Sequence, residues 1–260
     1  MSKPVAVVTG AARGIGKECA IQLAQCGFNL LINDLPDDES KSKLQDTADK
    51  IIANGAEVIC YSADISNLDC HEDFLAQAIT KWNRLDCLLN NAGISVKVRG
   101  DLLDVSPESF DRNIEVNTKA AFFLSQRFSR YLLEHPTNEA DPHRCIINIT
   151  SINAVMLAMN RGEYCVAKTA SSMTTKLFAL RLIPHNIGVY EIRPGLIQTE
   201  MTIPAIPHYT KLIEAGVVPQ RRWGFPDDIA STVCAMAKGQ LKYTCGVPIA
   251  IDGGLSMPTF

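Results

Sequence analysis

A tyrosine and a lysine four residues apart are the side chains of this sequence best suited to proton transfer. Tyr164 and Lys168 would share one face of a helix expected over about 162–184. A phenol titrates near pH ~10, too high for a base near neutrality, but an adjacent ammonium stabilises the phenolate and lowers that pKa. Ser151, 13 residues before Tyr164, ends an expected strand and can donate a hydrogen bond to a carbonyl or alkoxide oxygen. These residues predict general acid–base chemistry on a hydroxyl or carbonyl group.

A glycine-rich turn follows the first expected strand, residues 5–9. It reads TGAARGIG over residues 9–16. Gly10 permits a tight turn, Gly14 lets the backbone approach a pyrophosphate, and Gly16 lets the following helix pack closely against the strand. The N-terminus of that helix offers free N–H groups to an anion. The turn therefore predicts a dinucleotide site, with a βα turn that binds no ligand as the alternative.

Asp34 supports the dinucleotide interpretation. It ends the second expected strand, 18 residues after Gly16, where an acidic side chain meets the adenosine ribose hydroxyls. At ~4 Å and an effective dielectric constant of about 20, its carboxylate would repel a 2′-phosphate by roughly 4 kcal/mol. Arg13 favours the opposite choice, NADP, because a cation beside the turn could hold that phosphate. We predict NAD as the cofactor, with NADP as the alternative.

Two further segments end strands on the same edge. Asp64 follows the third strand, where its side chain could touch the adenine amino group, because Ser66 can cap the next helix in its place. Residues 90–93, with the sequence NNAG, close the fourth strand and would line the cofactor and tie strand edges together. The alternatives are a helix N-cap for Asp64 and an ordinary strand-end turn for 90–93.

Short apolar runs alternate with longer helical patterns along the chain. The expected strands are 5–9, 28–32, 57–61, 85–90, 145–150, 188–192 and 247–251, and the expected helices are 14–26, 39–54, 67–82, 107–134 and 162–184. Continuous apolar strands separated by helices are typical of a parallel sheet buried on both faces. We predict an α/β fold, a Rossmann-type doubly wound parallel sheet of about seven strands with helices on both faces, in a single domain over 1–260. Residues 135–144 are expected to be a polar loop, and residues 200–222 an irregular substrate lid.

Composition excludes several classes of protein. The 260 residues are 47% hydrophobic and 20% charged, as in ordinary globular chains, and the net charge of −3 gives no basic surface for a nucleic-acid partner. Nine cysteines form no CxxC pair and five histidines are scattered, so neither a disulfide framework nor a metal site is expected. No apolar run approaches the length of a membrane span, and a strand begins at Val5, which leaves no room for a secretory segment. A cytoplasmic protein is predicted.

These motifs together resemble the short-chain dehydrogenase/reductase family, in its single-domain branch. The resemblance covers essentially the whole chain in family order. It is carried by TGxxxGIG at 9–16, NNAG at 90–93, Ser151, YxxxK at 164–168, PG at 194–195 with Thr199 following, and DGG at 252–254. It implies an NAD(P)-dependent oxidoreductase in which Tyr164 gives or takes the hydroxyl proton while a hydride passes between carbon and nicotinamide.

The resemblance also implies roles for individual residues. Asn117 would complete the catalytic set with Ser151, Tyr164 and Lys168 by holding a water beside Lys168, which would also bind the nicotinamide ribose. The expected cofactor-binding residues are Gly10, Arg13, Gly14, Ile15, Gly16, Asp34, Asp64, Ile65, Asn91, Ala92, Gly93, Tyr164, Lys168, Pro194, Gly195, Ile197 and Thr199, with Ile197 and Thr199 on the carboxamide. The helices near 107–134 and 162–184 would build a four-helix interface, which implies a homodimer or homotetramer.

The substrate is expected to be a small-molecule alcohol or ketone. Four apolar side chains would make its pocket mostly apolar: Met156, Leu196, Met201 and Ile203. Arg161 and Glu163 could line the pocket mouth, but a solvated helix start is favoured for both. No arginine is identified that would bind a substrate carboxylate.

Two other functions are carried as alternatives. The first is a 3-oxoacyl-thioester (acyl-carrier-protein) reductase, in which Arg130 and Arg181 could meet an acidic carrier protein, although such reductases usually use NADP. The second is a non-catalytic nucleotide-sensing protein on the same fold. It is disfavoured because Asn117, Ser151, Tyr164 and Lys168 are all present.

Overall fold

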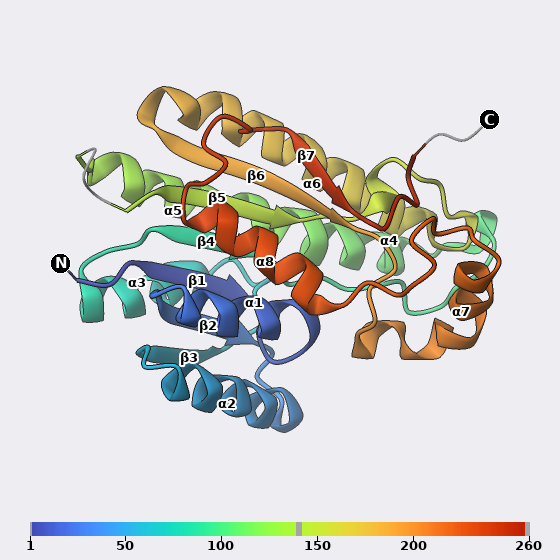
Figure 1. Cartoon of the computed structure of the whole chain (residues 1–260), viewed down its shortest axis with the longest axis horizontal. Coiled ribbons are helices and arrows are strands. Elements are labelled where there is room, and N and C mark those ends of the chain that lie inside the picture. The colour runs from blue at the N-terminus through green and yellow to red at the C-terminus, as the bar shows by residue number, and fades with distance from the viewer. Residues whose placement is uncertain (1, 139–141, 258–260) are drawn as a thin grey trace.

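The computed structural model describes residues 2–138 and 142–257, and within them seven parallel strands form one sheet (Figure 1). The strands are β1 (Val5–Thr9), β2 (Asn29–Asp34), β3 (Val58–Ser62), β4 (Cys87–Asn90), β5 (Arg144–Ile149), β6 (Ile187–Pro194) and β7 (Pro248–Ile251). Their order is β3-β2-β1-β4-β5-β6-β7, and every neighbouring pair is parallel. This confirms the predicted Rossmann-type doubly wound sheet.

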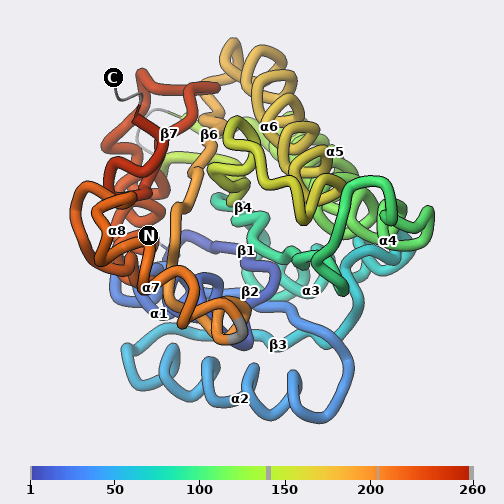
Figure 2. Tube along the Cα trace, turned by 90° about the vertical axis from the view of Figure 1, so that its right-hand side faces the viewer, coloured from blue at the N-terminus to red at the C-terminus, as the bar shows by residue number. Residues whose placement is uncertain are grey.

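Helices cover both faces of the sheet (Figures 1 and 2). One face carries α1 (Gly14–Gln25), α2 (Asp38–Ala53) and α8 (Pro226–Ala237), and the other carries α3 (Cys70–Trp82), α4 (Pro107–Ile114), α5 (Ala120–Glu134) and α6 (Gly162–Leu182). Because successive strand residues point to opposite faces, β1 contributes to two cores. Ala6 and Val8 pack in the core beneath α1, α2 and α8, and Val5 and Val7 in the core beneath α3, α5 and α6.

The helix expected over 107–134 is interrupted at its centre. Ser106 caps it by accepting a hydrogen bond from the Ser109 N–H at 3.2 Å, and Pro107 occupies its first turn. After α4, residues Glu115–Lys119 form a π-helical turn, and α5 begins directly after it at Ala120. Such turns are rare in proteins overall, and those that occur are often found at functional sites. This one carries Asn117.

Two segments, residues 200–222 and 226–237, differ from what the sequence predicted, and a third is described only in part. Residues 200–222 are not irregular throughout, because Glu200–Ala205 form a 3₁₀ helix and Ile206–Glu214 form α7 at the carboxyl edge of the sheet. Helix α8 was not expected at all. Its start is stabilised by Asp228, which accepts a hydrogen bond from the Phe225 N–H at 2.8 Å. Of the expected loop 135–144, residues 139–141 lie outside the described residues.

The topology creates a crevice at one edge of the sheet. The chain moves outward from β1 to β2 and β3, then returns to β4 on the other side of β1, so the connections after β1 and β4 diverge. Ligands of doubly wound folds bind at this switch point, outside the carboxyl ends of the strands. Among the described helices, none combines the length and apolar character needed to cross a bilayer.

Candidate active site

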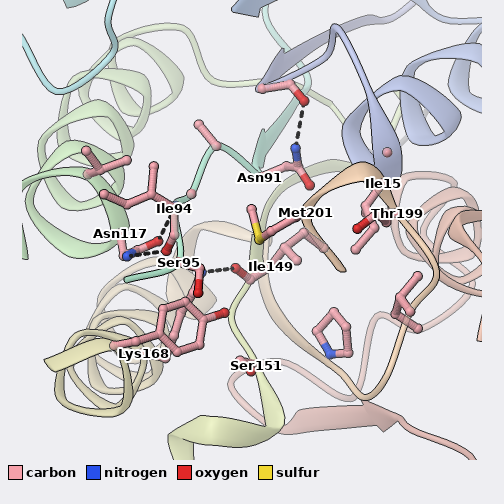
Figure 3. Close-up of a pocket in the computed structure, with 18 of the residues that line it drawn as sticks. Ile15, Asn91, Ile94, Ser95, Asn117, Ile149, Ser151, Lys168, Thr199 and Met201 are labelled. Atoms are coloured by element: carbon pink, nitrogen blue, oxygen red, sulfur yellow. Dashed lines mark hydrogen bonds between the residues drawn. The ribbon is translucent and has the colours of Figure 1, made fainter. Parts of the chain in front are cut away.

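A cavity of about 510 Å³ lies at this carboxyl edge. Its volume falls within the range of small-molecule sites, about 300–1,000 Å³. Figure 3 shows Asn117, Lys168 and Ser151 around one side of it, and Ile15 and Thr199 on the opposite side. The predicted site residues that line it are Gly10, Arg13, Gly14, Ile15, Asp34, Asp64, Ile65, Asn91, Ala92, Gly93, Asn117, Ser151, Tyr164, Lys168, Pro194, Gly195, Ile197 and Thr199.

Gly16 is the predicted cofactor residue that does not line the cavity. A Cβ at Gly16 would overlap the Gly10 carbonyl oxygen and the Asn91 amide nitrogen, so this glycine lets α1 pack beneath the turn. Gly10 has a φ of +67°, and a Cβ there would lie 2.9 Å from the Ala92 Cα. Gly14 has a φ of +55°, and a Cβ there would lie 3.4 Å from the Thr199 Cγ2. The turn is therefore shaped by backbone that only glycine tolerates.

The segment after β4 holds the turn in place. The Asn91 amide donates hydrogen bonds to the carbonyl oxygens of Thr9 and Gly10 at 3.0 and 2.9 Å. The Thr9 hydroxyl accepts from the N–H groups of Asn91 and Ala92 at 3.1 and 3.0 Å. One layer below, the Asn90 amide donates to Asn148 at 2.8 Å. Residues 90–93 thus tie β1, β4 and β5 together at the cavity floor, as the sequence predicted.

Asp34 is held at the end of β2 by the backbone. Its carboxylate accepts hydrogen bonds from the N–H groups of Ala12 and Leu35 at 2.8 and 2.9 Å, and the residue is 8% exposed. Arg13, the possible 2′-phosphate ligand, lies 3.6 Å from Glu200 and 3.9 Å from Glu39. Two carboxylates therefore already face this guanidinium.

Asp64 has partners that the sequence did not suggest. Its carboxylate accepts from the Ser66 hydroxyl at 2.7 Å and from the Arg112 guanidinium at 2.7 Å. Partial burial raises the pKa of Asp64, but the hydrogen bonds from Ser66 and Arg112 outweigh this and hold it below its usual value. The expectation that Ser66 leaves Asp64 free is wrong, because both residues belong to one network with Arg112 from α4.

Tyr164 and Ser151 meet at the other end of the cavity. Ser151 lies just after β5, and its hydroxyl accepts a hydrogen bond from the Asn153 N–H at 3.1 Å, which fixes the side chain. Tyr164 lies in the first turn of α6. Burial raises the pKa of Tyr164, while a hydrogen bond with Ser151 and the positive charge of Arg161 act in the opposite direction. The phenol is therefore protonated near neutral pH.

Lys168 lies one turn further along α6 and is 5% exposed. Its Nζ donates to the Ile149 carbonyl oxygen at 3.2 Å and lies 5.7 Å from the centroid of the Tyr164 ring (Figure 3). Burial lowers the pKa of Lys168 from 10.5 to about 8. The same burial strengthens the interaction of its ammonium with a nearby anion.

Asn117 is positioned by the π-helical turn. Its amide donates to the Ile94 carbonyl oxygen at 3.1 Å, and its side-chain oxygen accepts from the Ile94 N–H at 3.0 Å. A Cβ at Gly93 would lie 2.8 Å from the Asn117 oxygen and 3.4 Å from the Lys168 Nζ. Only glycine at this position leaves Asn117 and Lys168 adjacent across the same small space.

The substrate end of the cavity departs in part from the expected apolar pocket. Leu196 and Met201 line it, whereas Met156 and Ile203 do not. Ser95, Arg99 and Tyr209 also line it, although the sequence did not indicate them. Arg99 donates to the Tyr209 hydroxyl at 3.2 Å, joining the loop after β4 to α7. No local pattern marks these residues, because they come together only when residues 200–222 fold over the cavity.

The two charged residues before Tyr164 are not a solvated helix start. Arg161 lines the cavity, with its guanidinium carbon 5.7 Å from the centroid of the Tyr164 ring. Glu163 is 4% exposed and accepts a hydrogen bond from the Ser109 hydroxyl at 2.8 Å. Glu163 points into the protein because α4, which carries Ser109, packs against the start of α6, whereas Arg161 lines the cavity.

The residues present fit a nicotinamide dinucleotide. The glycine turn leaves room for a diphosphate at the N-terminus of α1, where Arg13 at the N-cap makes no capping hydrogen bond with its side chain. Asp34 lies at the ribose position of the fold. Among the described residues, no group of three His, Cys, Asp or Glu side chains could hold a metal ion.

Comparison with known proteins agrees with this geometry. A family model described as enoyl-(acyl carrier protein) reductase matches residues 10–256. A 3-oxoacyl-[acyl-carrier-protein] reductase from Synechocystis is 31% identical over 260 residues, covering 99% of this chain and 98% of that protein.

Solved structures give the same result. A 3-oxoacyl-[acyl-carrier protein] reductase from Brucella melitensis in complex with NAD superposes with a TM-score of 0.93 at 35% identity, covering 100% of both chains. A short-chain type dehydrogenase/reductase from Mycobacterium marinum superposes with a TM-score of 0.88 at 29% identity, covering 99% of this chain and 97% of that one.

Proposed function

The chain belongs to the short-chain dehydrogenase/reductase family of NAD(P)-dependent oxidoreductases, and we propose that it acts on a secondary alcohol or ketone with Tyr164 as general acid and base. One observation carries this proposal. Ser151, Tyr164, Lys168 and Asn117 surround one end of a cavity whose other end is a glycine turn at a helix N-terminus.

Each residue has a distinct task in ketone reduction. Ser151 donates a hydrogen bond to the carbonyl oxygen, and Tyr164 passes its proton to that oxygen as negative charge develops. The Lys168 ammonium stabilises the resulting phenolate, and Asn117 holds a water beside Lys168. When bound, the nicotinamide supplies or accepts the hydride. Alcohol oxidation follows the same path in reverse, with Tyr164 as base.

NAD is the proposed cofactor. The Asp34 carboxylate would face a 2′-phosphate, and at ~4 Å with an effective dielectric constant of about 20 this repulsion is roughly 4 kcal/mol. Arg13 offsets little of it, since Glu39 and Glu200 already lie within 3.9 Å of its guanidinium. Comparison of kcat/KM for NADH and NADPH tests the choice, and a preference for NADPH above tenfold would overturn it.

A 3-oxoacyl-thioester reductase is the second candidate, because relatives named for that activity match nearly the whole chain. Exposed Arg130 on α5 and Arg181 near the end of α6 would then contact an acidic carrier protein. The proposed use of NAD does not exclude this candidate, since the Brucella melitensis protein named for that activity is in complex with NAD.

We also propose a single dinucleotide-binding domain over 1–260, with residues 200–222 as a substrate lid, in a cytoplasmic homodimer or homotetramer. Helix α6 supports the assembly, because it exposes the apolar side chains Val166, Met173, Leu177 and Leu180. The nine cysteines, all free thiols, suit a reducing compartment. Light scattering on the purified protein measures the assembly, and a monomer would contradict it.

A substrate screen tests the proposed function. Purified protein with NADH and with NADPH is run against an acetoacetyl thioester, small diketones, keto-sugars and a steroid ketone. Oxidation of the nicotinamide with any of these supports an oxidoreductase, and thioester turnover supports the second candidate. NADH binding without turnover, here and with a panel of alcohols and NAD, would favour the nucleotide-sensing alternative.

A further inference from the structure

We propose that Arg161 binds a carboxylate of the substrate, so that the preferred substrate is a keto acid or the corresponding hydroxy acid. This inference rests on the proposed oxidoreductase function and names its substrate class. It concerns the cavity end that holds Ser151 and Tyr164 rather than the end shaped for a dinucleotide.

Arg161 lines the cavity beside Tyr164. It ends the short 3₁₀ helix Met159–Arg161, immediately before α6. Its guanidinium carbon lies 5.7 Å from the centroid of the Tyr164 ring, within the range of a cation–π contact. A group bound to Arg161 therefore lies beside the phenol that transfers the proton.

The guanidinium is not neutralised by the protein. Its Nε is buried without a hydrogen-bond partner, and no carboxylate of residues 2–138 or 142–257 forms an ion pair with Arg161. Glu163, two residues away, accepts a hydrogen bond from the Ser109 hydroxyl through one oxygen, and its other oxygen is buried without a hydrogen-bond partner. A buried donor without a partner is costly, and a carboxylate offers two oxygens that match the guanidinium fork.

The other arginines that line the cavity already have partners. Arg13 faces Glu39 and Glu200, and Arg112 pairs with Asp64 at 2.7 Å. Arg99 donates to the Tyr209 hydroxyl across the cavity mouth. Among the described residues, Arg161 is therefore the lining arginine with neither a hydrogen-bonded nor an ion-paired partner, and it lies beside the Tyr164 ring, which favours an anionic substrate group there.

The reaction balances with the carboxylate as a spectator. A hydride from NADH adds to the ketone carbon, the C=O π bond becomes a C–O bond, and Tyr164 gives its proton to the oxygen. NADH is oxidised to NAD⁺, and the ketone is reduced by two electrons to a hydroxy acid. The acyl thioester of a carrier protein places no carboxylate near its ketone, so Arg161 gives it no comparable contact.

Matched acids and esters test this inference. Acetoacetate, 4-oxopentanoate and 5-oxohexanoate are compared with their methyl esters, both as substrates with NADH and by calorimetric titration into the enzyme–NADH complex. The three lengths cover different spacings between ketone and carboxylate. The variants are Arg161→Gln, Arg161→Lys and Arg127→Gln, the last removing one positive charge from α5, where it faces Glu72.

The expected result is a preference for at least one acid over its ester in the wild type, about 10- to 100-fold in Kd and in kcat/KM where turnover occurs. Arg161→Gln should reduce the acid-to-ester ratio to about one. Arg161→Lys should retain part of the preference for the acid, and Arg127→Gln should leave the ratio unchanged. A ratio rather than a rate is compared, because loss of Arg161 also alters the surroundings of Tyr164.

The inference is overturned if no acid binds the NADH complex more tightly than its ester, or if Arg161→Gln keeps the preference. Reduction of neutral ketones and esters in that case would leave the proposed function standing. Failure of NADH itself to bind would contradict the proposed function instead, so the two failures are distinguishable.

Discussion

Burial of Lys168 predicts that its removal stabilises the protein in a pH-dependent way. The side chain is 5% exposed, and burial lowers its pKa from 10.5 to about 8. The unfolded chain therefore binds more protons than the folded chain between these values, and wild-type stability rises as pH increases through them. Lys168→Met replaces the ammonium by an apolar side chain of similar length and removes this dependence.

The expected difference in the free energy of unfolding between Lys168→Met and the wild type follows from the pKa difference and one hydrogen bond. The lowered pKa of Lys168 costs the folded state about 3 kcal/mol at pH 7, where the side chain is charged, and about 1 kcal/mol at pH 9.5, where the folded protein holds it mostly neutral and the unfolded chain does not. Loss of the hydrogen bond to the Ile149 carbonyl oxygen costs the variant about 1 kcal/mol at either pH. Lys168→Met should therefore be about 2 kcal/mol more stable than the wild type at pH 7 and roughly equal at pH 9.5.

Denaturant unfolding at both pH values measures this difference. Lys176→Met is the control, because Lys176 is an exposed lysine on the same helix and its replacement should change stability by less than about 0.5 kcal/mol at both pH values. A difference between Lys168→Met and the wild type that stays constant from pH 7 to 9.5, or a variant that is less stable at pH 7, would refute the reasoning.

Three further substitutions test other parts of the site. Asp34→Asn removes the charge that faces a 2′-phosphate and should shift the NADH-to-NADPH ratio of kcat/KM at least tenfold toward NADPH; an unchanged ratio contradicts the role of Asp34. Gly16→Ala places a methyl group against the Gly10 carbonyl oxygen, so NADH affinity measured by fluorescence titration should fall at least tenfold, and wild-type affinity would be inconsistent with the packing described. Ser151→Ala should lower kcat about 10²-fold with NADH affinity preserved, since one donor to the developing oxyanion is lost; a kcat within threefold of wild type argues against that contact.

The strands and most cavity-lining residues could be predicted from the sequence because their signals are local. A buried parallel strand appears as an unbroken apolar run, as in Val5–Thr9, and the residues that end such strands meet at one edge. Glycines at 10 and 14 mark positive φ, which the turn requires. Motif spacing then places Tyr164 and Lys168 on one helix face.

The remaining features depend on contacts between segments far apart in the chain. Asp64 is engaged by Arg112, a residue 48 positions later whose location depends on how α4 packs. Helix geometry alone did not indicate the π-helical turn that aims Asn117 at Ile94. Arg161 looked like a solvent-exposed residue because the sequence does not show that the cavity reaches the start of α6.

In the proposed mechanism, Tyr164 transfers the proton while other residues hold the cofactor. Tyr164→Phe removes one oxygen atom and keeps the ring that contacts Arg161 and Lys168. Measured on the best substrate of the screen, kcat should fall by at least about 10³-fold, within the range of general acid catalysis. The Kd for NADH should stay within about threefold of wild type. Turnover that survives the substitution would contradict the account, because another group would then supply the proton.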